Sequence, residues 1–141
     1  YLMLKRNKKE NDIHEGLTIS VGGKFEIGES PEDCVIREVK EETNLDIIKP
    51  KLRGIITFPN FDGNKDWYTY VFTAKDYTGN LTKDCNEGDL VWVKKNEIQN
   101  IKTWEGDYIF LDWLIQDKPF FSAKFNYKDN KFIDYEVTFY D

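Results

Sequence analysis

The chain has 141 residues, a formal charge of −6 and a pI near 4.9, and 40% of its residues are hydrophobic. This length suits one domain and is too short for two cores of ordinary size, while the apolar content excludes a disordered chain. The acidic balance argues against a general nucleic-acid binder, which carries a basic face. A nucleotide substrate is still compatible with it, because a divalent cation can bridge acidic side chains and phosphate.

The two cysteines, Cys34 and Cys85, lack the spacing of zinc or redox sites, which favours free thiols in a reducing cytoplasm. The sequence shows no signal peptide and no apolar run of membrane-spanning length. We therefore predict a cytoplasmic protein, monomeric or homodimeric, without a membrane or a nucleic-acid polymer as partner. Because the sequence opens with Tyr1 inside an apolar run, we expect that it lacks a short native N-terminal segment.

In chain order, the first predicted elements are a strand, a polar loop, a short alternating strand and a glycine-rich turn, over residues 1–6, 7–16, 17–21 and 22–29. A helix follows, because Ser30 can cap it and Pro31 suits its first position. The helix is predicted to run to about Thr43. Asn44 can then adopt the left-handed conformation that ends a helix.

Beyond this helix the pattern is mainly that of β-strands. Strands are predicted over residues 51–58, 67–75 and 90–93, with a turn over 59–64 and a second helix over 106–116. The last two strands, 120–128 and 131–140, are expected to pair as a hairpin across Asp129-Asn130. Two helices among many strands, without regular alternation, predict an α+β fold in one domain over residues 1–141.

The first helix carries three carboxylates, Glu38, Glu41 and Glu42, at positions i, i+3 and i+4. At roughly 100° per residue they share one arc of the helix. Val35 and Val39 beside that arc, with Ile36 further round, are expected to face the core. Like charges at these spacings repel each other by a few tenths of a kcal/mol per pair. Arg37 and Lys40 point elsewhere on the helical wheel, so the prediction is that they relieve this repulsion only in part.

Two interpretations of this cluster are open from the residues alone. A glutamate-rich helix is usually a solvated face. Alternatively, hard oxygen ligands on a rigid helix suit Mg²⁺ or Mn²⁺, which also bind substrate phosphates. The adjoining Gly22 and Gly23 favour the metal site, because they let the backbone approach a metal or a phosphate closely.

The same stretch resembles the signature of the Nudix hydrolases, G-x5-E-x7-R-E-U-x-E-E-x-G-U, where U is aliphatic. The matching positions are Gly23, Glu29, Arg37, Glu38, Val39, Glu41, Glu42 and Leu45. The single departure is Asn44 in place of the second glycine, and asparagine tolerates the same backbone conformation. The resemblance implies the Nudix fold, an α/β/α sandwich with a mixed β-sheet between helices, and here a C-terminal hairpin.

The resemblance also implies roles for these residues. The metal ligands would be the Gly23 carbonyl and the carboxylates of Glu38, Glu41 and Glu42, with Glu87 on a later loop as a further ligand or base. Glu29 would support the metal site or the water, and Arg37 would orient a glutamate by ion pairing. The general base is left open between Glu42, Glu38 and Glu87, and an exposed loop acid is an equally good reading of Glu87.

Further along, the segments 103–107 and 119–125 and the pair Asp134-Tyr135 resemble those of the MutT-like 8-oxo-dGTP diphosphatases of Gram-positive bacteria and their human counterpart. In this group a tryptophan stacks on the base and an acid bonds its edge. By position these would be Trp104 and Asp107, with Gly106 standing where the human counterpart has a second acid. The remaining predicted substrate contacts are Trp67 and Phe58, whose alternative is an ordinary core role, and Lys24.

The resemblance thus predicts a Mg²⁺-dependent (or Mn²⁺-dependent) enzyme that sanitises the nucleotide pool. It would hydrolyse oxidised purine nucleoside triphosphates, such as 8-oxo-dGTP, to a monophosphate and pyrophosphate. One alternative keeps the enzyme class and changes the substrate to ADP-ribose, a dinucleoside polyphosphate or a nucleotide sugar. The other is a non-catalytic nucleotide-sensing module, although such modules commonly lose the glutamates that this chain retains.

Overall fold

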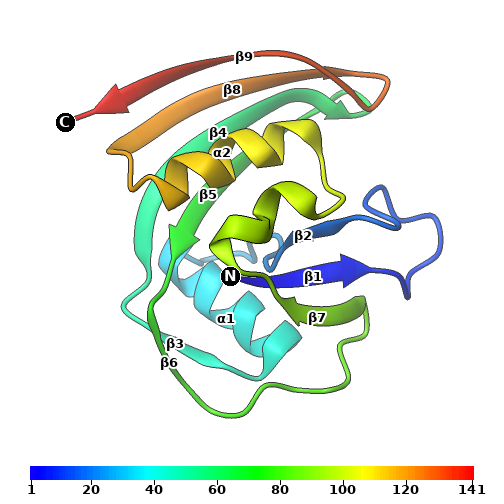
Figure 1. Ribbon diagram of the computed structural model, residues 1–141, viewed down its shortest axis with the longest axis vertical. Helices are drawn as coiled ribbons and strands as arrows, with labels where there is room; N and C mark the ends of the chain where they lie inside the picture. The colour runs from blue at the N-terminus through cyan, green and yellow to red at the C-terminus, as the bar shows by residue number, and fades with distance from the viewer. The chain divides into compact units, whose positions relative to one another are not determined.

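The computed structural model describes residues 1–141, which divide into two compact units. The first unit comprises Tyr1–Pro50 and Ala74–Thr103, and the second comprises Lys51–Thr73 and Trp104–Asp141. Each unit contains both a helix and β-strands, so the chain has the predicted mixed α+β composition (Figure 1). Neither α-helix is long and apolar enough to traverse a lipid bilayer, and the same holds for the short 3₁₀ helix.

The first unit contains two small antiparallel sheets. One has the order β2-β1-β7 and the other pairs β3 with β6; their strands are β1 (Leu2–Arg6), β2 (Thr18–Ser20), β7 (Gly88–Trp92), β3 (Asp46–Ile48) and β6 (Asp76–Thr78). Gly88 lies opposite Arg6, and a side chain at Gly88 would collide with the backbone of Lys5. This close approach fixes the start of β7 against the end of β1.

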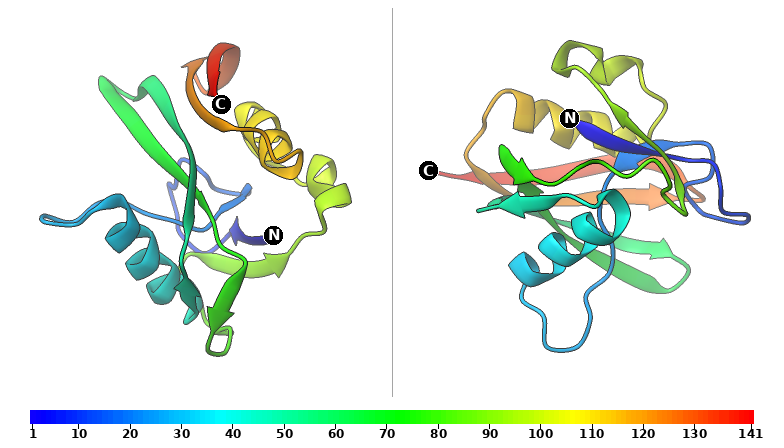
Figure 2. Two further views of the ribbon diagram at one scale, coloured as in Figure 1. Left: turned by 90° about the vertical axis from the view of Figure 1, so that its left-hand side faces the viewer. Right: turned by 90° about the horizontal axis from the view of Figure 1, so that it is seen from below.

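Helix α1 (Pro31–Thr43) begins and ends as the sequence predicts. The Ser30 hydroxyl accepts a hydrogen bond from the Asp33 amide, and the Asp33 carboxylate accepts one from the Ser30 amide, which completes a capping box. Asn44 closes the helix at φ 67°, and its side-chain amide donates to the Asn80 carbonyl. Figure 2 shows the loop that leads from β2 into this helix.

The buried face of α1 differs from the predicted one. Val35 and Val39 are half-buried and Ile36 is exposed, whereas Cys34 and Thr43 are the buried residues. The Thr43 hydroxyl donates to the Val39 carbonyl and accepts from the Leu45 amide, so this buried polar group has its partners. Burial raises the pKa of the Cys34 thiol, and both cysteines are free, as predicted.

The second unit is a mixed four-stranded sheet of order β5-β4-β8-β9 with helix α2 packed on it (Figure 1). Its elements are β4 (Lys51–Asp62), β5 (Lys65–Thr73), α2 (Glu105–Ile115), β8 (Phe120–Lys128) and β9 (Lys131–Tyr140). Trp113 of α2 packs edge-on against Phe121 and Phe125 of β8, at centroid distances of 5.0 and 5.9 Å. Strands β4 and β8 run parallel, and the other pairs are antiparallel.

The predicted C-terminal hairpin is confirmed. Strands β8 and β9 pair antiparallel across Asp129 and Asn130, whose φ angles of 52° and 63° are both positive. Two successive positive φ angles are characteristic of the tight turn that matches the twist of paired strands. The Asn126 amide also donates to the Asp134 carboxylate at 2.7 Å across the two strands.

The predicted turn over residues 59–64 is wrong in its first half, because β4 continues to Asp62. Between the pairs Phe58↔Trp67 and Asp62↔Lys65, residues 59–61 lie opposite Asp66 alone, which is a β-bulge. Asn60 adopts φ 51° there, and its amide donates to the Asp66 carboxylate. Pro59 is tolerated because a bulge interrupts the ladder that proline cannot join.

Three short elements were not predicted from the sequence. Strands β3 and β6 have three residues each, and the 3₁₀ helix η1 covers Lys95–Asn100. Unlike β2, whose three residues lie within an alternating run, β3 and β6 have no alternating pattern around them. Ile98 of η1 is fully buried, so this turn belongs to the core of the structure.

Candidate active site

Arg37 is the centre of an ion-pair network on the first unit. Its guanidinium contacts the carboxylates of Glu29, Glu38 and Glu41, with shortest N···O distances of 2.7, 2.7 and 3.2 Å. The helical wheel predicted only partial relief of the acidic cluster by this residue. Arg37 does reach Glu38 and Glu41, because its long side chain lies along the helix surface. Glu42 lies against Glu87 instead, so the relief is partial, as predicted.

Glu29 and Arg37 form a two-point contact that holds the loop before α1. Arg37 Nε and Nη2 donate to the two Glu29 oxygens at 2.7 and 2.9 Å, and the Glu26 amide donates to Glu29 at 2.7 Å. The hydrogen bond from Arg37 lowers the pKa of Glu29, and the bond from the Glu26 amide adds to this. Arg37 also donates to the Lys24 carbonyl, while the Lys24 residue is exposed. Glu29 and Arg37 therefore position the loop.

Glu42, by contrast, faces another carboxylate. Its side chain is hydrogen-bonded to Glu87 and lies within the electrostatic influence of Glu38. Burial raises the pKa of Glu42 to about 8, and the contact with Glu87 adds to the shift. The Gly22 amide donates to Glu42 at 3.3 Å and offsets a part of it. Arg37 therefore offsets the charges of Glu38 and Glu41, whereas Glu42 lies against Glu87.

Gly23 lies directly against the Glu38 carboxylate. A side chain at Gly23 would collide with the carboxylate carbon and both oxygens of Glu38, whereas a side chain at Gly22 would meet no atom within 4 Å. The two neighbouring positions therefore differ in whether a side chain fits: Gly22 has room for one and Gly23 has none. Only at Gly23 is the absence of a side chain needed for the helix carboxylate to reach the turn, a distinction that the sequence did not predict.

This arrangement fits a divalent cation. Two adjacent carboxylates in a partly buried position, one with a raised pKa, are stabilised by a positive charge between them. No three His, Cys, Asp or Glu side chains form a complete metal cage in the structure. Two of the predicted ligands, Glu38 and Glu41, are instead held by Arg37. The Glu41 side chain is also 56% exposed.

We expect Glu42→Gln to stabilise the cation-free protein, and more strongly at pH 8 than at pH 5. The folded-state pKa of Glu42 is about 8 and its ordinary value is 4.5. Because the pKa of Glu42 is higher in the folded state, the folded protein keeps a proton that the unfolded chain releases. The wild-type protein therefore loses stability as pH rises from 4.5 through 8. Glutamine mimics the protonated form at every pH. Thermal unfolding in EDTA should therefore show a gain in Tm of several degrees at pH 8 and little at pH 5. An equal gain at both pH values would contradict the charge-based account.

Three of the predicted substrate contacts, Trp104, Trp67 and Phe58, come together in an aromatic cluster of the second unit, whereas Lys24 belongs to the first unit. Phe61 is at its centre, with ring centroids 5.0 Å from Trp104, 4.9 Å from Trp67 and 5.5 Å from Phe58. Phe58 is buried, whereas Trp104 and Trp67 are half-buried. Phe58 is therefore chiefly a core residue, which is the alternative that the sequence left open, and the two tryptophans retain exposed surface for a ligand.

Phe61 and Tyr127 complete the cluster and were not singled out from the sequence. Phe61 fell in the predicted turn, and the bulge brings its ring to the same face as Phe58. The Tyr127 ring is 5.6 Å from Trp104 and 5.2 Å from Phe61. Burial raises the pKa of Tyr127, so this hydroxyl stays protonated at neutral pH.

The start of α2 explains the departure at Gly106. The Gly106 amide donates to the Tyr127 hydroxyl at 2.8 Å, and a side chain at Gly106 would collide with Phe125 and Tyr127. An acid at this position would therefore not fit. Two acids, Glu105 and Asp107, lie near Trp104 in the first turn of the helix. Glu105 is exposed, whereas Asp107 is half-buried.

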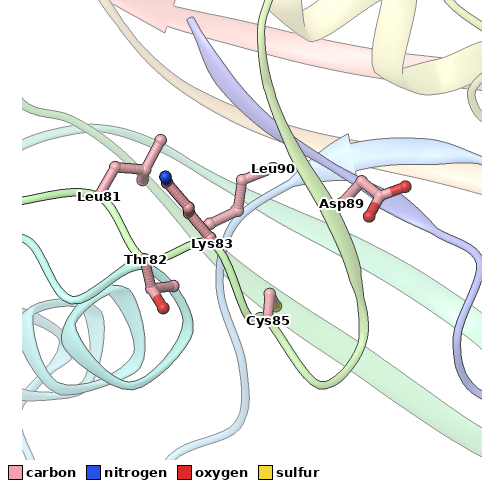
Figure 3. A pocket seen from close by; sticks show the side chains of 6 residues that line it. All are labelled: Leu81, Thr82, Lys83, Cys85, Asp89 and Leu90. Carbon is pink, nitrogen blue, oxygen red and sulfur yellow. The ribbon is translucent and has the colours of Figure 1, made fainter.

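A separate pocket lies in the first unit, beside the loop that carries Glu87 (Figure 3). All six lining residues come from the segment 81–90, namely Leu81, Thr82, Lys83, Cys85, Asp89 and Leu90. None of them is a predicted site residue. The pocket is therefore a feature of the loop and of the start of β7, apart from the carboxylates described above.

Comparison with known proteins places these observations in a family. The model of the NUDIX domain matches residues 1–114. The chain is 39% identical to the uncharacterized Nudix hydrolase YvcI of Bacillus subtilis over 115 residues, covering 79% of this chain and 73% of that protein. It is 26% identical to an ADP-ribose pyrophosphatase of Methanocaldococcus jannaschii over 107 residues, covering 76% and 63%. Among solved structures, a mutator MutT protein from Bacillus halodurans is similar at TM-score 0.85 and 29% identity, covering 96% of this chain and 88% of that one.

Proposed function

Since this chain belongs to the Nudix family and is a Nudix hydrolase of nucleotide derivatives, we propose that its substrates are purine nucleoside triphosphates, including oxidised ones such as 8-oxo-dGTP. The products would be a nucleoside monophosphate and pyrophosphate, and the role would be sanitation of the nucleotide pool in the cytoplasm. The observation that carries the proposal is the aromatic cluster around Trp104, with Asp107 three residues further along. The similarity to the Bacillus halodurans MutT protein supports it.

The proposal gives the carboxylates of the first unit the phosphate chemistry. Glu38, Glu41, Glu42 and Glu87 and the Gly23 carbonyl would hold Mg²⁺ or Mn²⁺. A bound cation of this kind lowers the pKa of water and stabilises charge on phosphoryl oxygens. Arg37 Nη1 lies 2.7 Å from Glu38, so this carboxylate already has a cationic partner. Glu42 and Glu87 are then the carboxylates available to accept the proton of the attacking water.

The proposal gives the second unit the recognition of the base. Trp104 offers an indole face to a purine, which is worth roughly 1–3 kcal/mol per base. Asp107, at the N-terminal turn of α2, would accept hydrogen bonds from the edge of the base. The Tyr127 hydroxyl, which accepts from the Gly106 amide, would hold this segment in place. Trp67 and the exposed Lys24 are the further substrate contacts that we propose.

The proposal is tested by measuring pyrophosphate release from 8-oxo-dGTP, dGTP and ATP in Mg²⁺, with and without Trp104→Ala. We expect turnover by the wild type and a fall in kcat/KM of roughly tenfold in the variant. Trp92→Ala is the matched control, because Trp92 is 58% exposed in the other unit and stacks on Tyr77. Its kcat/KM should stay that of the wild type. Absence of pyrophosphate release from every purine triphosphate would overturn the proposal.

ADP-ribose is the second candidate substrate, because a relative at 26% identity is an ADP-ribose pyrophosphatase. ADP-ribose, dinucleoside polyphosphates and nucleotide sugars therefore belong in the same panel. A higher kcat/KM for one of these compounds than for any triphosphate would transfer the assignment to it. Nucleotide binding without turnover of any compound would instead indicate a sensing module.

A further inference from the structure

A buried ion pair joins β1 to the loop that follows it. Arg6 Nε and Asp12 Oδ2 lie 2.7 Å apart, with 11% and 7% of the two side chains exposed. Both atoms are excluded from solvent and lie within ion-pair distance, but neither makes a hydrogen bond. Burying such a pair is costly unless its geometry is held and its remaining polar atoms are satisfied, so the pair adds little to the stability of the loop.

The surrounding backbone holds both partners. The Asp12 carboxylate accepts from the His14 amide at 3.2 Å through its other oxygen. The Arg6 amide donates to the Leu17 carbonyl, and the Arg6 carbonyl accepts from the Gly16 amide. Asp12 therefore fixes the direction of the Arg6 guanidinium. The backbone of Arg6 is held at both its amide and its carbonyl.

The guanidinium reaches past Asp12 to a second carboxylate. Arg6 Nη1 lies 3.4 Å from Glu87 Oε2, and the Glu87 side chain is 32% exposed. Glu87 is also the neighbour of Glu42. The contacts thus form a chain from Asp12 through Arg6 and Glu87 to Glu42. The collision that a side chain at Gly88 would cause with Lys5 shows how tightly the Glu87 loop is set against β1.

We propose that Arg6, oriented by Asp12, is a positioning residue that holds the Glu87 carboxylate beside Glu42 for a divalent cation. This inference rests on the proposed function, because it takes Glu42 and Glu87 as cation ligands. Without Arg6, the Glu87 carboxylate loses its cationic contact, and Glu87 turns towards solvent. Arg6 is itself no ligand, since a guanidinium carries only donors. It acts on the cation through Glu87, as residues behind metal ligands do.

The test is the dissociation constant for Mn²⁺, measured by the electron paramagnetic resonance of free Mn²⁺ in the absence of nucleotide. We expect Arg6→Gln to weaken Mn²⁺ binding about tenfold, and Asp12→Asn severalfold, because partners behind the ligands typically account for 10–100-fold in affinity. Arg6→Gln combined with Glu87→Gln should bind no more weakly than Glu87→Gln alone. A residue acting through Glu87 has no effect once that carboxylate is gone.

Arg53→Gln is the matched control for the loss of an arginine ion pair. Arg53 also has 11% of its side chain exposed and a 2.7 Å contact with an aspartate, Asp117, but it belongs to the other unit. Its variant should bind Mn²⁺ as the wild type does. If Arg6→Gln fails to fold, as shown by circular dichroism, Asp12→Asn decides the question.

Three results would overturn the inference. These are unchanged Mn²⁺ affinity in both Arg6→Gln and Asp12→Asn, additive losses in the double variant, and a raised KM for nucleotide without any change in Mn²⁺ binding. The last result would make Arg6 a substrate contact. Glu42→Gln separates this failure from that of the proposed function. If Mn²⁺ affinity is indifferent to Glu42→Gln as well, the cation site itself is wrong.

Discussion

Glu42→Gln is expected to lower kcat for nucleotide hydrolysis by about two to three orders of magnitude, the size of effect seen when a group that stabilises transition-state charge is removed. Glutamine keeps the shape of the side chain but removes the negative charge and the ability to accept a proton. The measurement is pyrophosphate release at saturating Mg²⁺ and nucleotide. Loss of fold does not explain the effect, because the same substitution is expected to stabilise the cation-free protein at pH 8.

Glu32→Gln is the control for this substitution. Glu32 is an exposed acid in the first turn of the same helix, and it has no part in the network around Arg37. Its variant should retain the wild-type kcat. If Glu42→Gln keeps a third or more of the wild-type kcat, Glu42 is neither the base nor an essential ligand, and the account centred on it is wrong.

Gly23→Ala is expected to reduce kcat/KM by about a hundredfold, because an error of about 1 Å in a catalytic group can cost that much. The added methyl group would occupy the position of the Glu38 carboxylate, so either the turn or the side chain must move. Displacement of Glu38 would also disturb its 2.7 Å contact with Arg37. Steady-state kinetics in Mg²⁺ measure the effect.

Gly22→Ala is a control in the adjacent position of the same turn. A side chain at Gly22 would meet no atom within 4 Å, and its backbone needs no positive φ. The Gly22 amide that donates to Glu42 is unchanged by the substitution. We expect kcat/KM within about threefold of the wild type, because new side chains in open surface positions change little. Similar losses at both glycines would indicate that turn flexibility, and not the collision with Glu38, matters.

The helices and the longer strands could be predicted because their signals are local. Ser30, Pro31 and Asn44 mark the ends of α1 through interactions within a few residues, and Asp129-Asn130 similarly marks the hairpin turn. The short strands β3 and β6 carry no such signal. They exist because of a partner strand distant in the sequence, which no local pattern contains.

The charge distribution of the site could be predicted only in part. The positions of the glutamates on the helix follow from its periodicity, but the reach of Arg37 depends on the path of a long side chain. The pairing of Glu42 with Glu87 joins residues 45 positions apart and depends on tertiary structure. For the same reason the contact between Arg6 and Glu87 could not be found from spacing.

The bulge in β4 means that the length of this strand, and not only its side chains, determines the aromatic cluster. Phe58 and Phe61 are three positions apart, so a regular strand would place them on opposite faces. Their rings are 5.5 Å apart only because residues 59–61 oppose a single residue of β5. Removing Pro59 and Asn60 would restore an unbroken ladder and turn Phe61 away from Phe58 without replacing any aromatic residue. The place of Phe61 in the cluster is therefore set by the number of residues in β4 as much as by their identity.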